Sequence, residues 1–286
     1  ADMRDNRSRV SEAIAAGAVY VQDQLTRENM DQFLSKYLSA GDFLLDLAWN
    51  IDANAIIGQH VMPLIPVGKV GFKSGLYMAS TDELYVKVIG KGGHGAMPQL
   101  NIDPVVIAAQ IIISLQQIVS RMSSPIIPSV LSFGKVIANG ATNVIPNEVT
   151  MEGTFRTLNE KWRLEAHDKM VKMATMIAES MGGKCEFEVR KGYPFLHNDE
   201  TLTAKAKQHA IEFLGPENVI DLDIWMAAED FAYYSQIIPA CFYRLGTRNE
   251  EKGIVSSVHT PTFDIDENAL EIGSGLMAYL AICELA

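Results

Sequence analysis

The order of predicted elements between residues 82 and 191 is the feature that most restricts how this chain can fold. The order is strand, helix, strand, strand, helix, strand, and these elements are predicted at residues 84–89, 103–121, 129–137, 148–157, 160–181 and 184–190. This β-α-β-β-α-β order is typical of the split, ferredoxin-like arrangement, in which four antiparallel strands carry two helices on one face. About 110 residues are enough for such a unit to fold independently.

The residue pattern supports these elements. Apolar residues recur at helical spacing over 103–121, where Pro104 occupies a first-turn position that proline favours. In the strand at 148–157, Val149, Met151 and Phe155 fall on one face, which is therefore predicted to be buried. The methionines of the second helix are expected to fill the core, because methionine does so far more often than it forms a binding stripe; they are Met170, Met173, Met176 and Met181.

The segments on either side mix helices and strands as α/β proteins do. Helices are predicted within residues 8–48, followed by a short strand at 54–58. The elements predicted after the central unit are helices at 199–214, 230–236 and 267–285 and a buried strand at 241–245. The simplest architecture is one α/β domain formed by residues 1–76 and 192–286, with residues 77–191 inserted into it.

Charge and composition exclude several classes of protein. The 24 Lys and Arg residues against 35 Asp and Glu give a formal net charge of −11, the wrong sign for gripping nucleic-acid phosphates nonspecifically. No apolar run reaches the roughly 18–20 residues of a membrane span, and the charged residues 1–9 do not resemble a secretory signal. The three cysteines form no Cys-x-x-Cys pair and are odd in number. We therefore expect a cytoplasmic protein without disulfides and without nucleic-acid or membrane partners.

Three of the six histidines stand in surroundings that suit a functional site. His60 follows a short apolar strand, where ligands of α/β sheets usually collect. His94 sits among four glycines, which leave the backbone bare to a ligand, and His259 lies in a loop before an acidic run. On spacing alone, a structural role for each is as well supported as a functional one. The other three are predicted to be solvated surface residues: His167, His197 and His209.

Five motifs, in this order, carry a family resemblance. They read GGHGAMP at 92–98, ATNVIP at 141–146, GTFRT at 153–157, AEDFAYY at 228–234 and HTPTFD at 259–264. Together they resemble the metal-dependent amidohydrolases that include aminoacylases, hippurate hydrolases and indoleacetyl-amino-acid hydrolases, relatives of carboxypeptidase G. The resemblance runs nearly continuously from about residue 51 onward. It implies an α/β metal-hydrolase catalytic domain with an inserted ferredoxin-like lid, which often dimerises.

The resemblance also implies a reaction and its residues. The family cleaves the amide bond of N-acyl amino acids or small peptides with two divalent metals, usually zinc or manganese. His60 and His259 match metal ligands, a role that suits neutral imidazole. His94 matches the lid histidine that polarises the scissile carbonyl or stabilises its oxyanion, commonly in the active site of the partner subunit. Asn143 and Arg156 match positions that hold the substrate, and a guanidinium can grip a carboxylate with two hydrogen bonds.

The sequence departs from the family pattern before His60. The family's Cys-Gly-His-Asp-x-His run and its Glu-Glu pair, which supply further metal ligands and the general base, are missing there. We therefore expect an incomplete catalytic domain that binds one metal or none, because two imidazoles are too few for a two-metal site. Glu229 lies in a segment typical of the family, and we expect it to support the metal ligands rather than to bind metal.

Two interpretations of function remain open at the sequence level. The first is a metal-dependent hydrolase of N-acyl amino acids or small peptides that forms a homodimer through its lid. The second is a catalytically impaired or truncated relative that acts as a binding or dimerisation protein. A serine or cysteine hydrolase is disfavoured, because no Gly-x-Ser-x-Gly motif occurs and Cys185 and Cys241 fall within apolar strands.

Overall fold

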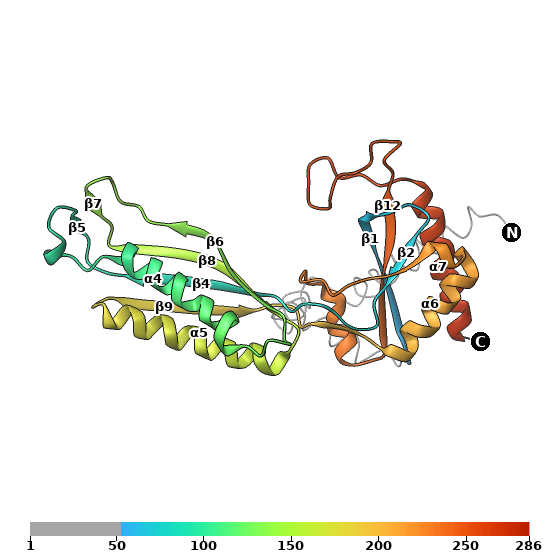
Figure 1. Cartoon of the computed structure of the whole chain (residues 1–286), viewed down its shortest axis with the longest axis horizontal. Coiled ribbons are helices and arrows are strands. Elements are labelled where there is room, and N and C mark those ends of the chain that lie inside the picture. Colours follow the sequence, from blue (N-terminus) through green and yellow to red (C-terminus); the bar gives the residue numbers. More distant parts are fainter. Residues whose placement is uncertain (1–52, 286) are drawn as a thin grey trace, which may run out of the picture. The chain divides into compact units, whose positions relative to one another are not determined.

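The computed structural model describes residues 53–285, and the helices predicted within residues 8–48 lie outside this range. The described residues form two four-stranded sheets and two smaller two-stranded ribbons (Figure 1). One four-stranded sheet belongs to residues 82–191, which we call the βαββαβ unit. The other is formed by the segments on either side, which we call the flanking unit.

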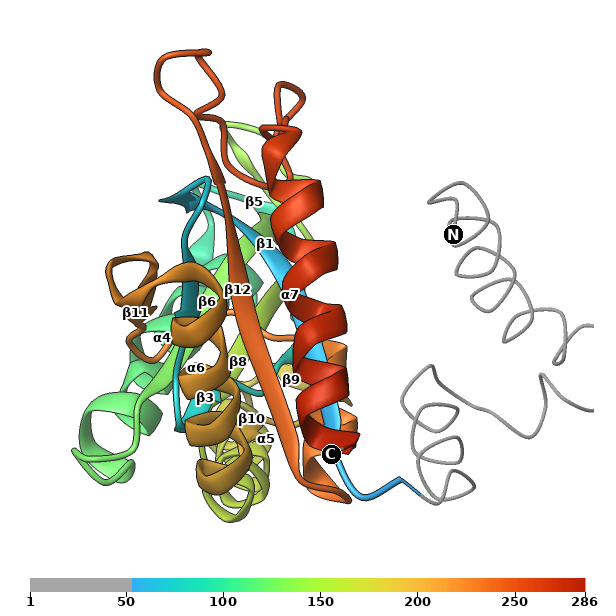
Figure 2. The same ribbon diagram turned by 90° about the vertical axis from the view of Figure 1, so that its right-hand side faces the viewer.

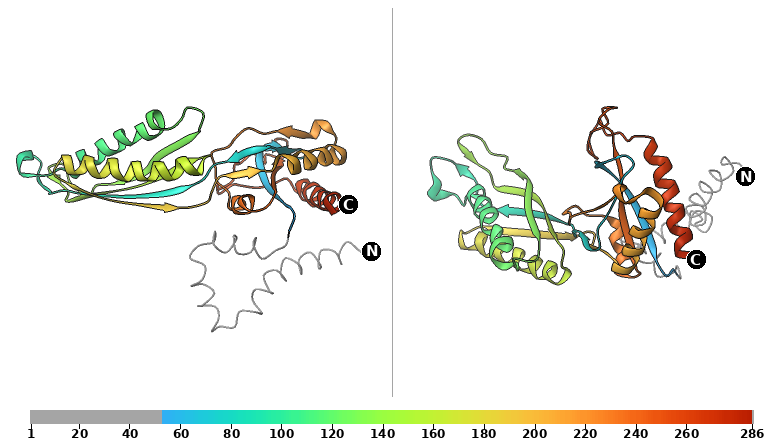
Figure 3. Two further views of the ribbon diagram at one scale, coloured as in Figure 1. Left: turned by 90° about the horizontal axis from the view of Figure 1, so that it is seen from below. Right: turned by 45° about the vertical axis from the view of Figure 1, so that its right-hand side comes forward.

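The βαββαβ unit has the element order that its sequence predicts. Its elements are β4 (Asp82–Ile89), α4 (Pro104–Gln117), β6 (Ser129–Ile137), β8 (Glu148–Thr157), α5 (Glu160–Ser180) and β9 (Lys184–Lys191). The strands pair antiparallel in the order β6-β8-β4-β9, and α4 and α5 cover the same face of the sheet (Figure 3). Alternate strand residues and the inner faces of both helices form one apolar core, which includes Leu84, Ile111, Phe155 and Met170.

Local signals in the sequence account for the helix ends. Asp103 caps α4, because its Oδ1 accepts hydrogen bonds from the backbone N–H groups of Val105 and Val106. Asn159 caps α5 in the same way through the N–H of Trp162. After α5, Gly182 adopts a φ of +83°, a left-handed conformation that glycine reaches without strain and that ends the helix. The last turn of α4 continues as the π-helix η2 (Ile118–Met122).

Three short elements extend the end of this sheet where β4 finishes and β8 begins. Strands β5 (Gly93–His94) and β7 (Val144–Ile145) pair antiparallel, followed along the chain from β5 by the short helix η1 (Pro98–Leu100). In Figure 1, β5 and β7 lie at the end of the βαββαβ unit that is remote from its connections to the flanking unit. The glycine-rich motif at 92–98 therefore forms an exposed ribbon and turn.

The flanking unit is a mixed sheet in the order β1-β12-β2-β11. The strands are β1 (Ile56–Pro66), β12 (Ala240–Arg248), β2 (Val70–Phe72) and β11 (Val219–Asp221). β1 runs parallel to β12, and β12 runs antiparallel to β2. Helices α6 (Glu200–Leu214) and α7 (Asn268–Leu285) lie beside one another along this sheet (Figure 2) and contribute to one core with the β12 side chains Cys241, Tyr243 and Leu245.

A second core lies on the other face of the same sheet. Phe242 and Ala240 of β12 pack there against Tyr77, Met78 and Phe231. Tyr77 and Met78 belong to β3 (Gly75–Met78), which pairs with β10 (Leu196–Asn198), and Phe231 belongs to the 3₁₀ helix η4 (Asp230–Gln236). A further 3₁₀ turn, η3 (Pro216–Asn218), precedes β11. The predicted strand at 241–245 is thus buried on both faces, as its continuous apolar run indicates.

A buried polar cluster lies where the two connections enter and leave the βαββαβ unit. Arg163 and Asp82 are both fully buried, with Nη2 2.5 Å from Oδ1, and Nη2 also donates to the carbonyl oxygens of Thr81 and Gly192 at 2.9 and 3.0 Å. His167 Nε2 lies 2.6 Å from Asp82 Oδ2. Burial alone would raise the pKa of Asp82, but hydrogen bonds from His167 and Arg163 lower it below its usual value. The prediction that His167 is a solvated surface residue is therefore wrong.

The prediction that the methionines of α5 fill the core is corrected in part by their exposure. Met170 is fully buried, but Met176 is 58% exposed and Met181 is 39% exposed, so these two do not fill the core. Among the described residues, Pro104–Met122 is one helical stretch long and apolar enough to cross a membrane, by length and composition alone. Its inward residues pack in the core of the βαββαβ unit.

Candidate functional site

His60 lies within the parallel pair of β1 and β12 rather than after a strand. The register continues past it, with His60 opposite Arg244 and Met62 opposite Gly246. The sequence prediction ended this strand at Gly58, which was too early, because the pairing with β12 holds the next residues extended. Phe242 and His60 contact on the same face, with ring centroids 6.3 Å apart in an edge-on arrangement. This is the face opposite α6 and α7.

One backbone contact settles which nitrogen of His60 is available to a ligand. His60 Nδ1 lies 2.8 Å from the carbonyl oxygen of Val61. Since a carbonyl oxygen only accepts, Nδ1 carries the hydrogen, and Nε2 of the neutral ring keeps its lone pair. In a metal-binding histidine, the ring nitrogen that does not bind the metal usually donates its hydrogen to a group such as a backbone carbonyl.

Glu229 is the last residue of the segment that joins β11 to η4, and it directly precedes η4. It is half-buried, and burial, followed by a hydrogen bond with Asp230, raises its pKa to about 7. Arg156, at the end of β8, donates from Nη1 to the carbonyl oxygen of Met226 at 3.2 Å. Arg156 thus contacts the segment that carries Glu229, at a residue three positions before Glu229.

His259 lies in the long loop between β12 and α7. It is exposed and has a φ of +62°, which is unusual for a residue with a side chain. The base of this loop is fixed by the buried Asp266, which accepts from Asn249 and pairs with Lys252 at 3.0 Å. Within the loop, Thr260 Oγ1 donates to the carbonyl oxygen of Ser257 at 2.7 Å.

His94 and Asn143 come together at the exposed ribbon of β5 and β7. The N–H of Gly95 donates to the carbonyl oxygen of Asn143 at 2.8 Å. His94 Nδ1 accepts from the N–H of Ala96 at 3.0 Å. Because a backbone N–H only donates, Nε2 of the neutral ring carries the hydrogen and is free to donate. An exposed donor of this kind is what stabilisation of an oxyanion requires.

The ribbon and Arg156 lie at opposite ends of the βαββαβ unit. Strand β8 begins at Glu148, close to β7, and reaches Arg156 eight residues later. At the usual rise of an extended strand, these eight residues span about 26 Å. Within one chain, therefore, His94 and Asn143 do not share a substrate-sized site with Arg156.

The comparison with family models decides the family. Residues 11–282 match the model described as "Peptidase family M20/M25/M40". The chain belongs to this family. The match covers nearly the whole chain, so the M20 family assignment rests on both units and confirms the resemblance that the five motifs indicated.

Curated and solved members of the M20 family agree with the assignment. The chain is 34% identical over 234 residues to IAA-amino acid hydrolase ILR1-like 4 of Arabidopsis thaliana, which covers 80% of the chain and 53% of the relative. It is 38% identical over 232 residues to N-acetylcysteine deacetylase of Bacillus subtilis, which covers 81% of the chain and 59% of the relative. The chain thus spans little more than half the length of these relatives.

A solved structure shows the same fold. A dinuclear metal-binding peptidase of the M20 family from Bacillus subtilis superposes with a TM-score of 0.67 at 32% identity, over 86% of this chain and 61% of that one. The mixed α/β fold of the M20 family is therefore shown for the described residues. The domain boundaries at residues 77 and 191 remain predictions.

The described residues do not form a complete metal site by themselves. Across residues 53–285, no three His, Cys, Asp or Glu side chains gather into a group that could hold a metal ion. His60 nevertheless fits the role of one ligand, because its Nε2 lone pair is free and its ring is fixed. A zinc site requires at least three protein ligands, so any metal site that includes His60 and His259 needs further donors.

Arg244 is a residue beside this face that the sequence analysis missed. It is opposite His60 in the strand register and only 1% exposed. The signal was present as a charged residue within the apolar run Phe242-Tyr243-Arg244-Leu245, because arginine is almost never fully buried without a partner.

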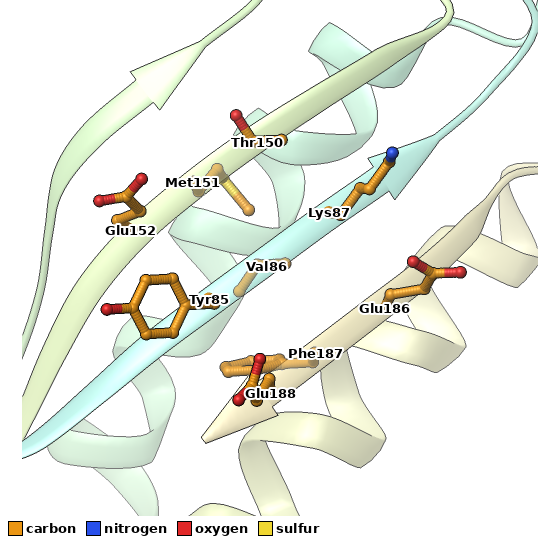
Figure 4. A pocket seen from close by; sticks show the side chains of 9 residues that line it. All are labelled: Tyr85, Val86, Lys87, Thr150, Met151, Glu152, Glu186, Phe187 and Glu188. Atoms are coloured by element: carbon orange, nitrogen blue, oxygen red, sulfur yellow. The ribbon is translucent and has the colours of Figure 1, made fainter. Parts of the chain in front are cut away.

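A separate hollow of about 450 Å³ lies on the open face of the four-stranded sheet in the βαββαβ unit (Figure 4). Figure 4 shows side chains of β4, β8 and β9 around it: Tyr85, Val86, Lys87, Thr150, Met151, Glu152, Glu186, Phe187 and Glu188. None of the predicted site residues belongs to this set. Its exposed charges are those of a solvated sheet face.

Proposed function

We propose that this M20 family member acts as a metal-dependent hydrolase that cleaves the amide bond of N-acyl amino acids or small peptides. The names of the curated relatives support this substrate class, since they describe hydrolysis of an amino acid conjugate and deacetylation of an N-acyl amino acid. The observation in this chain that carries the proposal is His60, a half-buried histidine on β1 with its Nδ1 fixed and its Nε2 free.

Each of the predicted site residues has a separate role in amide hydrolysis under this proposal. His60 and His259 would hold a divalent metal, zinc or manganese, together with further donors. When bound, such a metal lowers the pKa of water and polarises a carbonyl. Arg156 carries a positive charge suited to the carboxylate of an acyl amino acid, and Asn143 can donate to or accept from the substrate amide. His94 donates from Nε2 to the oxygen of the scissile carbonyl as negative charge develops there.

We further propose that the βαββαβ unit is the lid and that two lids form a homodimer. The separation of His94 and Asn143 from Arg156 supports this arrangement, because a second chain would bring its ribbon to the first chain's site. The outer face of α4 is apolar, with Val106 53% exposed and Ile113 67% exposed. Strand β6 lies at the edge of the sheet and can pair with a second copy. A cytoplasmic location fits the three cysteines, all free in the described residues.

Metal content and turnover test the proposal together. We expect purified protein to retain zinc or manganese by elemental analysis and to hydrolyse N-acetyl amino acids or hippurate. His60→Ala should lose both metal and turnover, whereas His209→Gln should change neither, because His209 lies on α6 against Glu212 at 3.2 Å. Protein that holds no metal and turns over no substrate, even after zinc or manganese is added, would favour the binding or dimerisation role instead.

A further inference from the structure

Arg244 is a buried cation that lacks an ion pair in the described part of the chain. Its Nε donates to Tyr77 Oη at 2.9 Å, and its Nη2 lies 2.9 Å from Met78 Sδ. Within residues 53–285, no carboxylate forms a salt bridge with it. Burying a charge without a paired carboxylate is costly, and an apolar side chain of similar volume would fill the same space more cheaply. A role that needs the guanidinium would explain why it is there.

Aromatic rings surround the Arg244 guanidinium, and Glu229 interacts with it electrostatically without forming a salt bridge. The Cζ atom of Arg244 lies 4.9 Å from the ring centroid of Trp225, 4.9 Å from that of Phe242 and 5.7 Å from that of Tyr77. A cation over an aromatic face is attracted by the ring's quadrupole, more strongly where water is excluded. The planar guanidinium suits this stacking better than a lysine ammonium does.

Trp225 connects this cluster to the segment that carries Glu229. The N–H of Trp225 donates to the carbonyl oxygen of Tyr77 at 2.9 Å, and the N–H of Ala79 lies within hydrogen-bond distance of the carbonyl oxygens of Trp225 and Ala227. Its ring, 38% exposed, covers the guanidinium from outside. Residues 225–227, just before Glu229, are thus fixed by their backbone to the β3 end and by the Trp225 ring to Arg244 of β12.

Arg244 is also tied to the strand pair that carries His60. The two residues are register partners in the parallel pair of β1 and β12, so their side chains leave the same face. Phe242 contacts both of them, with its ring 6.3 Å from the ring of His60 and 4.9 Å from Cζ of Arg244. One cluster of side chains therefore joins His60 to the 225–229 segment.

We propose that Arg244 is a positioning residue of the hydrolytic site, whose guanidinium fixes residues 225–229 and thereby holds Glu229 beside the face that carries His60. This inference rests on the proposed function, which places the reaction at that face. Arg244 does not touch substrate, because its side chain is buried behind Trp225 and Tyr77. Arg156 contacts the same segment through the carbonyl oxygen of Met226, so the segment is held from both units.

Hydrogen exchange tests the positioning role without relying on activity. In Arg244→Met, we expect amides of residues 222–230 to exchange about tenfold faster or more, because the stack that closes the segment is lost. Amides of α5 should keep their parent rates, and Arg244→Lys should fall between. The matched control is Arg190→Met, which removes an exposed arginine whose Cζ lies 4.4 Å from the Tyr85 ring and should leave exchange at 222–230 unchanged.

A milder variant keeps the test decisive if Arg244→Met does not fold. Tyr77→Phe removes only the hydroxyl that accepts from Nε, and it should speed exchange at 222–230 in the same direction with a smaller effect. Unchanged exchange at 222–230 in the folded variants, or an increase spread evenly over β1, β12 and α5, would overturn the positioning role.

Kinetics then test the link to Glu229. With parent enzyme that hydrolyses an N-acetyl amino acid, Arg244→Met should lower kcat by about tenfold or more and change KM by no more than about twofold, since the substrate contacts remain. Faster exchange at 222–230 with an unaltered kcat would refute that link. If the parent hydrolyses no substrate, the proposed function fails by itself, and the exchange rates alone decide whether Arg244 fixes the segment.

Discussion

Two histidines of this chain are held in opposite tautomers by a single backbone contact each. Val61 accepts from Nδ1 of His60, which leaves a lone pair on Nε2, whereas Ala96 donates to Nδ1 of His94, which leaves a hydrogen on Nε2. The first arrangement suits a ligand of a metal ion and the second a donor to an oxyanion. The sequence identified both residues but could not assign the tautomers, because the two neighbouring backbone groups are placed by β1 and by the β5 ribbon.

Replacing His94 should affect the chemical step more than substrate binding. We expect His94→Ala to lower kcat by about 10²–10³-fold with little change in KM, because its Nε2 donor acts on charge that develops only in the transition state. Steady-state kinetics with an N-acetyl amino acid measures both constants. Folding should be unaffected, since the side chain is exposed. An equal rise in KM with kcat preserved would show instead that His94 binds the ground state.

Glu229 should make stability depend on pH near neutrality. Burial and the contact with Asp230 raise its pKa to about 7 from an ordinary value of 4.5, so the folded state binds a proton that the unfolded state releases. The protonated form stabilises the fold fully below about pH 4.5, and this contribution is lost as pH rises through about 7. Glu229→Gln keeps a neutral side chain, so urea denaturation should show the variant gaining stability over the parent as the pH rises from about 4.5 to 7. A constant difference across that range would contradict the assignment.

Buried polar residues do not reveal their partners in the local sequence. The partners of Arg244 and His167 are distant along the chain: Tyr77 for the first and Asp82 for the second. His167 in particular lies on a helix among polar residues, a pattern typical of a solvated face. Only the packing of α5 against the start of β4 reveals that it is 13% exposed and held by a carboxylate.

At the scale of elements, the periodicity of apolar residues predicted the βαββαβ unit closely. Strands β6 and β8 have the predicted bounds, and α5 begins at the predicted residue because Asn159 caps it. The short strands β2, β3, β10 and β11 were not predicted, since three or four residues carry too little pattern and these strands exist through pairing with distant segments. β1 was predicted too short because its later residues are held extended by pairing with β12, which is distant along the chain.

The polar cluster at the base of the βαββαβ unit should be among its most sensitive points. Arg163 bridges Asp82, Thr81 and Gly192 and is fully buried, so Arg163→Met leaves the Asp82 carboxylate buried with His167 as its remaining side-chain partner. Breaking a buried ion pair in this way costs about 3–5 kcal/mol, which urea denaturation would measure. Arg190→Met, which removes an exposed pair with Glu188, is the matched control and should change stability little. Equal effects of the two substitutions would show that the contacts of Arg163 with Asp82, Thr81 and Gly192 do not stabilise the fold.

At the scale of the whole molecule, the proposed homodimer makes a prediction about how the separated site residues combine. His60 lies in the flanking unit and His94 at the far end of the βαββαβ unit, so in a homodimer each active site would combine His60 of one subunit with His94 of the other. Two inactive variants should then restore one another. In a His60→Ala and His94→Ala heterodimer, one site carries both substitutions and the other carries neither.

Co-expression of the two variants with different affinity tags tests this arrangement in full. Random pairing makes half of the dimers mixed, and one of two sites in each mixed dimer is intact, so activity should reach about a quarter of the parent value. Mixed dimers isolated through both tags should reach about half. If both histidines of a site came from one chain, every site in the mixture would lack one of them. Mixed dimers without activity would therefore refute the shared site, and each variant expressed alone sets the background.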